Sequence, residues 1–145
     1  MNKFKGEAFL FHFASIGNLK SFQQYFEDGN ININWKSSIF EETPFFVASK
    51  NGRLEIVEYM LASQRELNIL SKDHKRISPV EIAKINSELQ EKLEYENEEN
   101  EIKQRQANCL SIYNLLQEYQ SNLKGVKSQL RKKLKLKGLN FHLFQ

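Results

Sequence analysis

The sequence has few of the residues that bridge, kink or break a chain. Its 145 residues include one cysteine, two prolines and six glycines. A lone cysteine, Cys109, excludes an intrachain disulfide and is typical of proteins in a reducing cytosol. So few prolines and glycines argue against long flexible linkers, and a hydrophobic content of 40% is adequate for one core. We therefore expect a single domain over residues 1–145.

Long apolar runs are also missing. No stretch reaches the ~18 consecutive apolar residues of a membrane-spanning helix, so we expect no transmembrane segment. The first residues, MNKFKGEAFLFHFA, contain an acid and a histidine, and we expect them to open the fold and not to act as a signal peptide. These features predict a cytoplasmic protein, in the host cell if the source is a pathogen.

Motifs for catalysis, metal binding and cofactor binding are absent as well. The sequence has no glycine-rich phosphate loop, no Cys–His ligand spacing and no nucleophile in a suggestive context. His12, His74 and His142 are far apart along the chain. Asp28 and Asp73 are the only aspartates and fall in predicted turns, where a side-chain oxygen commonly bonds to the nearby backbone. We expect neither an enzyme nor a bound metal or cofactor.

The segment TPFFVASKNGRLEIVEYMLA, residues 43–62, predicts two short helices. Thr43 can cap the first helix, Pro44 suits its first position, and Asn51-Gly52 supplies a left-handed end. The second helix has an apolar stripe opposite a solvated face, namely Leu54, Val57, Met60 and Leu61 against Glu55 and Glu58. Helices this short are marginal alone in water, so the pair must pack against neighbours.

Copies of this segment occur on both sides. A shift of 35 residues aligns FHFASIGNLKSFQQYF with FVASKNGRLEIVEYML and places Gly17 on Gly52. The same shift in the other direction places Ser78-Pro79 on Thr43-Pro44, so that SPVEIAKIN is a third inner helix. Self-similarity at a fixed step is typical of stacked helix pairs, each of which buries its apolar faces against the next.

The middle copy, TPFFVASKNGRLEIVEYMLASQRELNI, resembles an ankyrin repeat. Its matching residues are Thr43, Pro44, Ala48, Gly52, Val57, Leu61 and Asn68. The first copy keeps Gly6, Leu10, Ala14, Gly17 and Asn34 but has Ala8-Phe9 for Thr-Pro, whereas the third keeps Asp73, Ser78, Pro79 and Ala83 but has Arg76 for the usual glycine. Phe46 replaces the usual histidine. The resemblance implies an all-α, ankyrin-type helical solenoid with helix-turn-helix units at about 3–36, 37–71 and 72–121.

An insertion over about residues 87–107 separates the inner and outer helices of the third unit. Its sequence, SELQEKLEYENEENEIKQRQANC, delays the outer apolar pattern of Ile112, Leu115 and Leu116. We predict an extended helical hairpin, with the inner helix running past Tyr95, a turn near residues 97–100 and the outer helix starting near Glu101. The alternative is a disordered acidic loop, because glutamates are abundant here.

The C-terminal segment, residues 122–145, is strongly basic. It contains Lys124, Lys127, Arg131, Lys132, Lys133, Lys135 and Lys137, with Val126, Leu130 and Leu134 as one apolar stripe. The pattern predicts an amphipathic helix with three possible roles. It caps the solenoid with its lysines in solvent and its LNFHLF tail over the core, it binds nucleic acid or an anionic membrane, or it docks on a partner protein.

The ankyrin resemblance implies a concave surface formed by loop tips and inner helices. It places there Phe4, Lys5, Phe40, Glu42, Lys50, Asn51, His74, Lys75 and Ile77, with Trp35 beside them. Exposed aromatic residues next to charges suit a protein interface. Alternatively, Trp35, Ile39 and Phe40 fold inward between units. The predicted function is protein–protein interaction through this surface, and the alternative is electrostatic binding of nucleic acid or anionic membrane through the basic segment.

Overall fold

The fold is all-α, as the sequence predicts. The structure, a computed structural model, describes residues 4–89 and 98–138, which form seven helices and no strand. The helices are α1 (Lys5–Ile16), α2 (Leu19–Phe26), α3 (Pro44–Lys50), α4 (Leu54–Ala62), α5 (Pro79–Glu88), α6 (Glu98–Ser121) and α7 (Leu123–Leu136).

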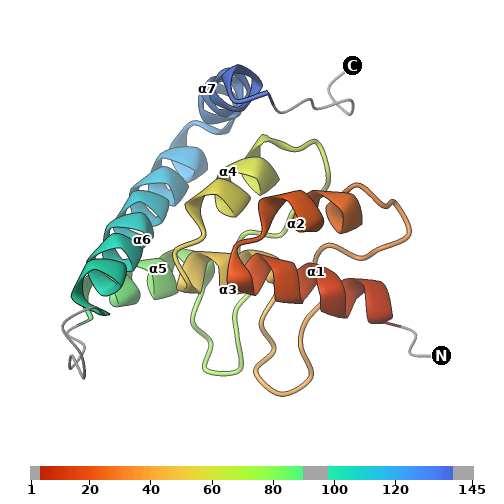
Figure 1. The fold of residues 1–145 in the computed structure, drawn as a ribbon, viewed down its shortest axis with the longest axis horizontal. Coiled ribbons are helices and arrows are strands. Elements are labelled where there is room, and N and C mark those ends of the chain that lie inside the picture. Colours follow the sequence, from red (N-terminus) through yellow and green to blue (C-terminus); the bar gives the residue numbers. More distant parts are fainter. Residues whose placement is uncertain (1–3, 90–97, 139–145) are drawn as a thin grey trace.

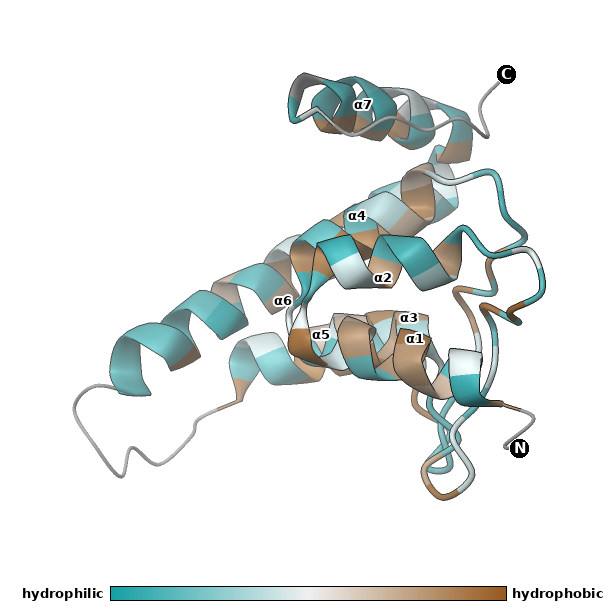
Figure 2. Cartoon of the chain, turned by 45° about the vertical axis from the view of Figure 1, so that its right-hand side comes forward, coloured by the Kyte–Doolittle hydropathy of each residue, from teal (hydrophilic) through white to brown (hydrophobic). Residues whose placement is uncertain are grey.

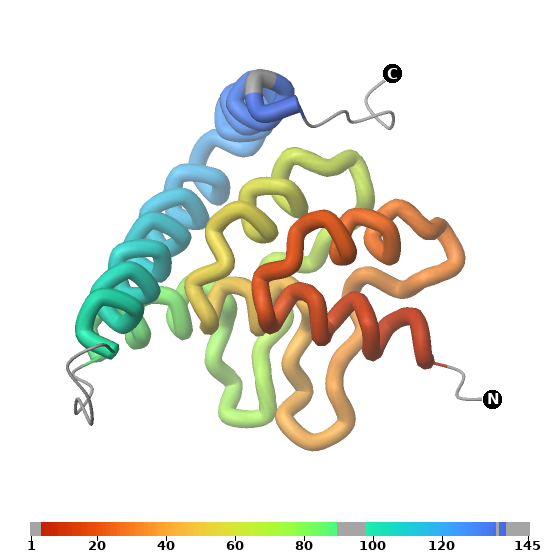
Figure 3. Tube along the Cα trace, viewed as in Figure 1, coloured from red at the N-terminus to blue at the C-terminus, as the bar shows by residue number. Residues whose placement is uncertain are grey.

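The first six helices form three consecutive pairs. Helices α1, α3 and α5 lie side by side in one row, and α2, α4 and α6 form a second row, with α2 and α4 above α1 and α3 in the view of Figures 1 and 3. Within each pair the second helix turns back along the first, and α7 packs on α4 and α6. Each short helix is therefore stabilised by its neighbours, as helices of this length require.

The predicted starts of two inner helices are confirmed. The Thr43 hydroxyl accepts a hydrogen bond from the Phe46 amide at 3.0 Å, and Pro44 follows at the first helical position. In α5 the Ser78 hydroxyl and the Glu81 carboxylate each accept a bond from the other residue's backbone amide, which forms a capping box. These bonds lower the pKa of the exposed Glu81 carboxyl. Sequence signals within four residues are therefore enough to fix where α3 and α5 begin.

Two glycines make the turns inside the first and second pairs. Gly17 and Gly52 have φ of 78° and 70°, in the left-handed region that glycine adopts without strain. A Cβ atom at Gly17 would lie 2.8 Å from Arg53 Cδ, whose Nε donates to the Ser15 carbonyl at 2.9 Å. Gly17 is therefore required both by backbone conformation and by the close approach of Arg53.

Replacing Gly17 with alanine should lower the free energy of unfolding by about 1–2 kcal/mol, because alanine is strained in the left-handed region. Urea denaturation followed by circular dichroism measures this loss. Gly29→Ala is the matched control, since a Cβ there would meet no atom within 4 Å and its φ is not left-handed. Equal stability of the two variants would contradict the role given to Gly17.

A hydrogen bond between neighbouring pairs recurs at the repeat step. Asn51 Nδ2 donates to the Ser15 carbonyl at 3.1 Å, and Asn86 Nδ2 donates to the Lys50 carbonyl at 2.8 Å. Both bonds span 36 residues along the chain. In both cases an asparagine side chain at or near the end of one inner helix bonds to the end of the preceding inner helix. The first and second inner helices, and the second and third, are therefore joined in the same way. This use of Asn51 removes it from the predicted binding surface.

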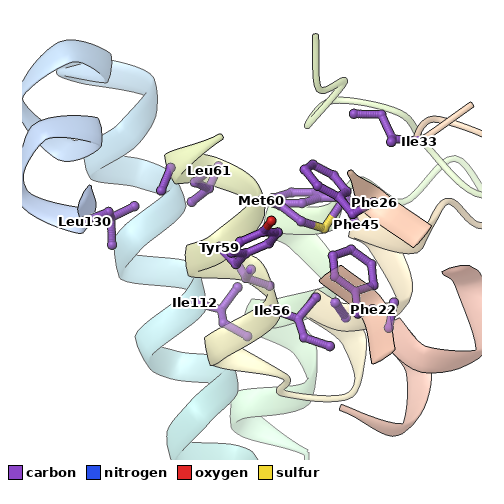
Figure 4. Close-up of a cluster of buried hydrophobic side chains, with 14 of the residues drawn as sticks. Phe22, Phe26, Ile33, Phe45, Ile56, Tyr59, Met60, Leu61, Ile112 and Leu130 are labelled. Atoms are coloured by element: carbon purple, nitrogen blue, oxygen red, sulfur yellow. The ribbon is translucent and has the colours of Figure 1, made fainter. Parts of the chain in front are cut away.

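The core lies between the two rows of helices. It is built from aromatic and aliphatic side chains of α2, α3 and α4, with contributions from α6 and α7 (Figure 4). Phe22 and Phe26 stack at 5.4 Å between ring centroids, and Tyr59 meets Phe26 edge-on at 5.5 Å. The Tyr59 hydroxyl donates to Glu27 at 2.9 Å, and burial followed by this bond raises the Tyr59 pKa.

The predicted helical hairpin of the third pair needs correction. Helix α5 ends at Glu88, and Leu89 is extended with ψ of 122°, so the inner helix does not continue unbroken to Tyr95. Residues 90–97 lie outside the described residues. Helix α6 begins at Glu98, earlier than expected, so the alternative of a disordered loop is wrong for residues 98–107. Figure 2 shows α6 as largely hydrophilic, in agreement with the thin apolar seam of its sequence.

Candidate binding surface

Two short turns project side by side from the ends of the inner helices (Figure 1). In the first, the Ser37 amide donates to the Glu42 carbonyl at 2.9 Å and the Glu41 amide to the Ser37 carbonyl at 3.1 Å. In the second, the Asp73 amide donates to the Ile77 carbonyl and the Arg76 amide to the Asp73 carbonyl, both at 3.0 Å. Residues 38–40 and 74–75 therefore form the tips. We call residues 36–41 and 72–76 together the loop-tip surface.

Both turns contain a non-glycine residue in the left-handed region. Glu41 has φ of 54° and Arg76 has φ of 63°. Such conformations are uncommon outside glycine and persist where surrounding bonds over-determine them. The two residues are 35 positions apart, so the left-handed conformation recurs at the repeat step.

The two turns are bonded to each other. The His74 amide donates to the Phe40 carbonyl at 3.0 Å, His74 Nδ1 lies 3.1 Å from the same oxygen, and the two rings are 5.3 Å apart. Lys36 Nζ donates to the Lys72 carbonyl at 3.1 Å. The tips are therefore held in one arrangement before any partner arrives, which reduces the entropy lost on binding.

The loop-tip surface exposes apolar side chains. Ile39 is 76% exposed and Phe40 is 54% exposed. The alternative in which Ile39 and Phe40 fold inward is wrong, because closure of the turn between Ser37 and Glu42 leaves them beyond the helices. Exposed large apolar residues gathered at one place are typical of an interaction site.

The same surface is basic because it has more exposed cations than exposed acids. Lys36, Lys72, Lys75 and Arg76 are exposed. Asp73 Oδ1 accepts bonds from the Lys75 and Ile77 amides at 3.0 and 2.9 Å, which confirms its predicted turn role. Glu42 is buried and pairs with Lys50 at 3.1 Å. Glu41 is the acid that remains exposed in the first turn.

Trp35 lies beside the loop-tip surface in a separate aromatic cluster. Its ring is half-buried, 6.0 Å from Phe11 in an edge-on arrangement and 6.5 Å from Phe4, which is 45% exposed. The alternative prediction, that Trp35 folds inward between units, is therefore correct in part. This cluster joins the start of α1 to the segment that leads into the first turn.

The structure brings some of the predicted site residues together and separates others. Phe40, His74 and Lys75 meet at the tips, and Phe4 meets Trp35. The prediction that Glu42 lies on an exposed surface is corrected, because its carboxylate is buried against Lys50. The remaining predicted residues serve other contacts or are partly covered: Lys5 has its ammonium 5.9 Å from the Phe9 ring, Lys50 holds Glu42, and Ile77 is half-buried.

The basic segment forms α7, and its apolar stripe is buried as predicted. Val126, Leu130 and Leu134 are at most 5% exposed. Not all of its cations lie in solvent, however. Lys127 and Arg131 donate to the Ser63 and Ala62 carbonyls at the end of α4, each at 3.1 Å. Burial, with a smaller contribution from Arg131, lowers the pKa of Lys127. The predicted placement of the LNFHLF tail over the core falls outside the described residues.

Two further cations, Lys133 in α7 and Lys137 directly after it, are paired with acids of α4. Lys133 Nζ lies 2.5 Å from the buried Glu58 carboxylate, and Lys137 Nζ lies 3.6 Å from Glu55. The prediction that Glu58 faces solvent is wrong, because α7 covers it. Four of the seven cations of the alternative basic site thus have contacts within the chain, although Lys133 and Lys137 remain partly exposed. Lys124, Lys132 and Lys135 are exposed and form no ion pair with a residue that the structure describes.

Other kinds of site find no support in the described part of the chain. No group of three metal-ligating side chains is placed to hold an ion in residues 4–89 and 98–138. Cys109 is buried on α6, as expected, and burial raises its thiol pKa. Among the seven helices described, none has both the length and the apolar content to cross a membrane.

Sequence comparison adds no assignment. No protein-family model matches the chain, and no curated protein matches it. The function must therefore be inferred from the surface itself.

Proposed function

We propose that this chain is an ankyrin-type repeat protein that binds another protein through the loop-tip surface and the adjoining Phe4–Trp35 cluster. Ankyrin-type stacking is supported by features that recur at the 35-residue step: Gly17 with Gly52, Glu41 with Arg76, Thr43 with Ser78, and Asn51 with Asn86. The proposed activity is noncovalent recognition without catalysis.

One observation carries the binding proposal. Ile39 and Phe40 are exposed on the first turn, which is bonded to the second turn through the Phe40 carbonyl and the His74 amide. Exposure of apolar side chains in water is unfavourable, whereas burial against a partner recovers about 25 cal/mol per Å² of apolar surface. Aromatic anchors on a preorganised surface commonly dominate binding energy.

Replacing Phe40 with alanine should weaken partner binding by about tenfold or more, as expected for loss of a buried aromatic anchor. The immobilised full-length chain is used to isolate proteins from lysate, and affinities of each purified candidate are then measured by calorimetry for wild type and variant. Folding should be unchanged, because Phe40 is 54% exposed. Ser38→Ala is the control on the same turn. A partner whose affinity is the same for wild type and Phe40→Ala would contradict the proposed site.

A further inference from the structure

We infer that the partner presents an acidic peptide segment with a large apolar side chain, which docks on the loop-tip surface. This inference rests on the proposed function and adds the chemistry of the partner. It depends on which charges of the two turns remain available, on the apolar residues next to them, and on the fixed distance between the tips.

The available charge is positive. Lys75 and Arg76 are exposed at and beside the second tip, and neither forms an ion pair with a residue that the structure describes. The neighbouring acid, Asp73, is occupied with the Lys75 and Ile77 amides. An approaching carboxylate therefore meets two cations without displacing an internal partner. The exposed acids that oppose it are Glu41 in the first turn and Glu81 in the first turn of α5, which interacts with Lys72.

The backbone of the second turn places a cation where glycine would fit with less strain. Arg76 has φ of 63°, and its amide is held by the Asp73 carbonyl at 3.0 Å. A side chain at such a position is a reason to look for function. A guanidinium at the tip can bind a carboxylate through two parallel hydrogen bonds, a geometry that lysine cannot reproduce.

The first turn supplies the apolar half of the site. Ile39 and Phe40 are exposed, and the Phe40 ring lies 5.3 Å from the His74 ring in the second turn. Apolar and basic tips are therefore adjacent and fixed. A peptide with acids around one large apolar residue satisfies both halves together.

Other anionic partners fit less well. A nucleic acid could pair with the cations and stack one base on the Phe40 ring, but Ile39, which is 76% exposed, offers no flat face for stacking a second base. An anionic membrane could accept both halves, but Ile39 and Phe40 are a small apolar area, and Trp35, the residue best suited to a membrane interface, is half-buried against Phe4 and Phe11. A peptide is therefore the partner that the surface favours.

The test uses the full-length, isotope-labelled chain and a short synthetic peptide of glutamates around one phenylalanine. Addition of the acidic peptide should change the amide chemical shifts of residues 36–41 and 72–77 in two-dimensional NMR. These changes should become smaller as the salt concentration rises, because salt screens the attraction between charges. A peptide with lysines in place of the glutamates should leave them unchanged. Equal effects of the two peptides, or no effect of the acidic one, would overturn the inference.

Charge reversal provides the second arm. Lys75→Glu combined with Arg76→Glu should weaken binding of the acidic peptide about tenfold or more, because attraction becomes repulsion. Lys20→Glu, at an exposed position of α2, is the matched control and should keep wild-type affinity. Trp35 fluorescence and circular dichroism verify folding of each variant. Stronger binding to anionic lipid vesicles or to single-stranded DNA than to the acidic peptide would also count against the inference.

The outcomes separate this inference from the proposed function. If a purified partner loses affinity with Phe40→Ala but not with the double charge reversal, the surface binds protein and the acidic chemistry is wrong. If neither change affects that partner, the proposed site fails as well. Loss with both changes, together with binding of the acidic peptide, supports both proposals.

Discussion

Replacing Phe22 with alanine should lower the free energy of unfolding by about 3–5 kcal/mol. Phe22 is fully buried on α2, stacks on Phe26 at 5.4 Å and meets the Tyr59 ring of α4 edge-on at 6.3 Å (Figure 4). Truncation removes apolar contacts on both sides and leaves a cavity between the first and second helix pairs. Urea denaturation followed by circular dichroism measures the loss.

Phe40→Ala is the matched control, because it deletes the same atoms from an exposed site and should change stability by less than about 0.5 kcal/mol. The cooperativity of unfolding is also informative. The eight-residue α2 cannot persist alone, so the Phe22 variant should still unfold in one transition. Early loss of α1 and α2, with the other helices intact, would contradict mutual stabilisation of the pairs.

Helix starts could be predicted because their determinants are local. The caps at Thr43 and Ser78 act on amides three residues away, so the sequence alone contains both partners. The contacts of Arg65 could not be predicted in this way. Its guanidinium donates to the Phe26 and Ile31 carbonyls at 2.5 and 3.1 Å, across gaps of 39 and 34 residues that only the packed fold brings together.

The candidate site was predictable to the extent that it follows the repeat register. The register places Phe40 and His74 in equivalent loops, although Phe40 is equivalent to Lys75 and not to His74, and the Phe40 and His74 rings are in contact. The exposure of Ile39 remained open because residue type does not determine whether a lengthened loop folds inward. Burial of Glu42 was missed because it depends on turn closure and on Lys50, which is eight residues away along the chain.

Burial of Glu58 was missed for a different reason. Glu58 lies on α4, on which α7 packs, and its carboxylate is paired with Lys133 of α7. The amphipathic pattern of α7 predicts that a face is buried but not which helix it covers. From the sequence alone, the basic side chains of this helix could face solvent, contact a ligand or pair with an acid of the same chain.

The Lys133→Ala variant distinguishes these roles and should lower the free energy of unfolding by about 2 kcal/mol, because it leaves a buried charge without its partner. Truncation of Lys133 removes the ammonium group that lies 2.5 Å from the Glu58 carboxylate, and Glu58 is only 3% exposed. Loss of one partner of a fully buried pair costs about 3–5 kcal/mol, and we expect less here because water reaches the half-exposed Lys133 side chain. Lys132→Ala, at an exposed neighbouring position, should change stability by less than about 0.5 kcal/mol.

A double-mutant cycle with Glu58→Gln isolates the pair. A neutral amide is easier to bury unpaired than a carboxylate, so Lys133→Ala should be less destabilising by about 1 kcal/mol when the Glu58→Gln change is already present. Equal losses in both backgrounds would mean that Lys133 acts through packing and not through charge. If Lys133→Ala leaves stability unchanged but abolishes binding to single-stranded DNA or anionic vesicles, α7 is a ligand site whose contact with Glu58 contributes little. A stability loss without any binding change assigns its cations to holding α7 on α4.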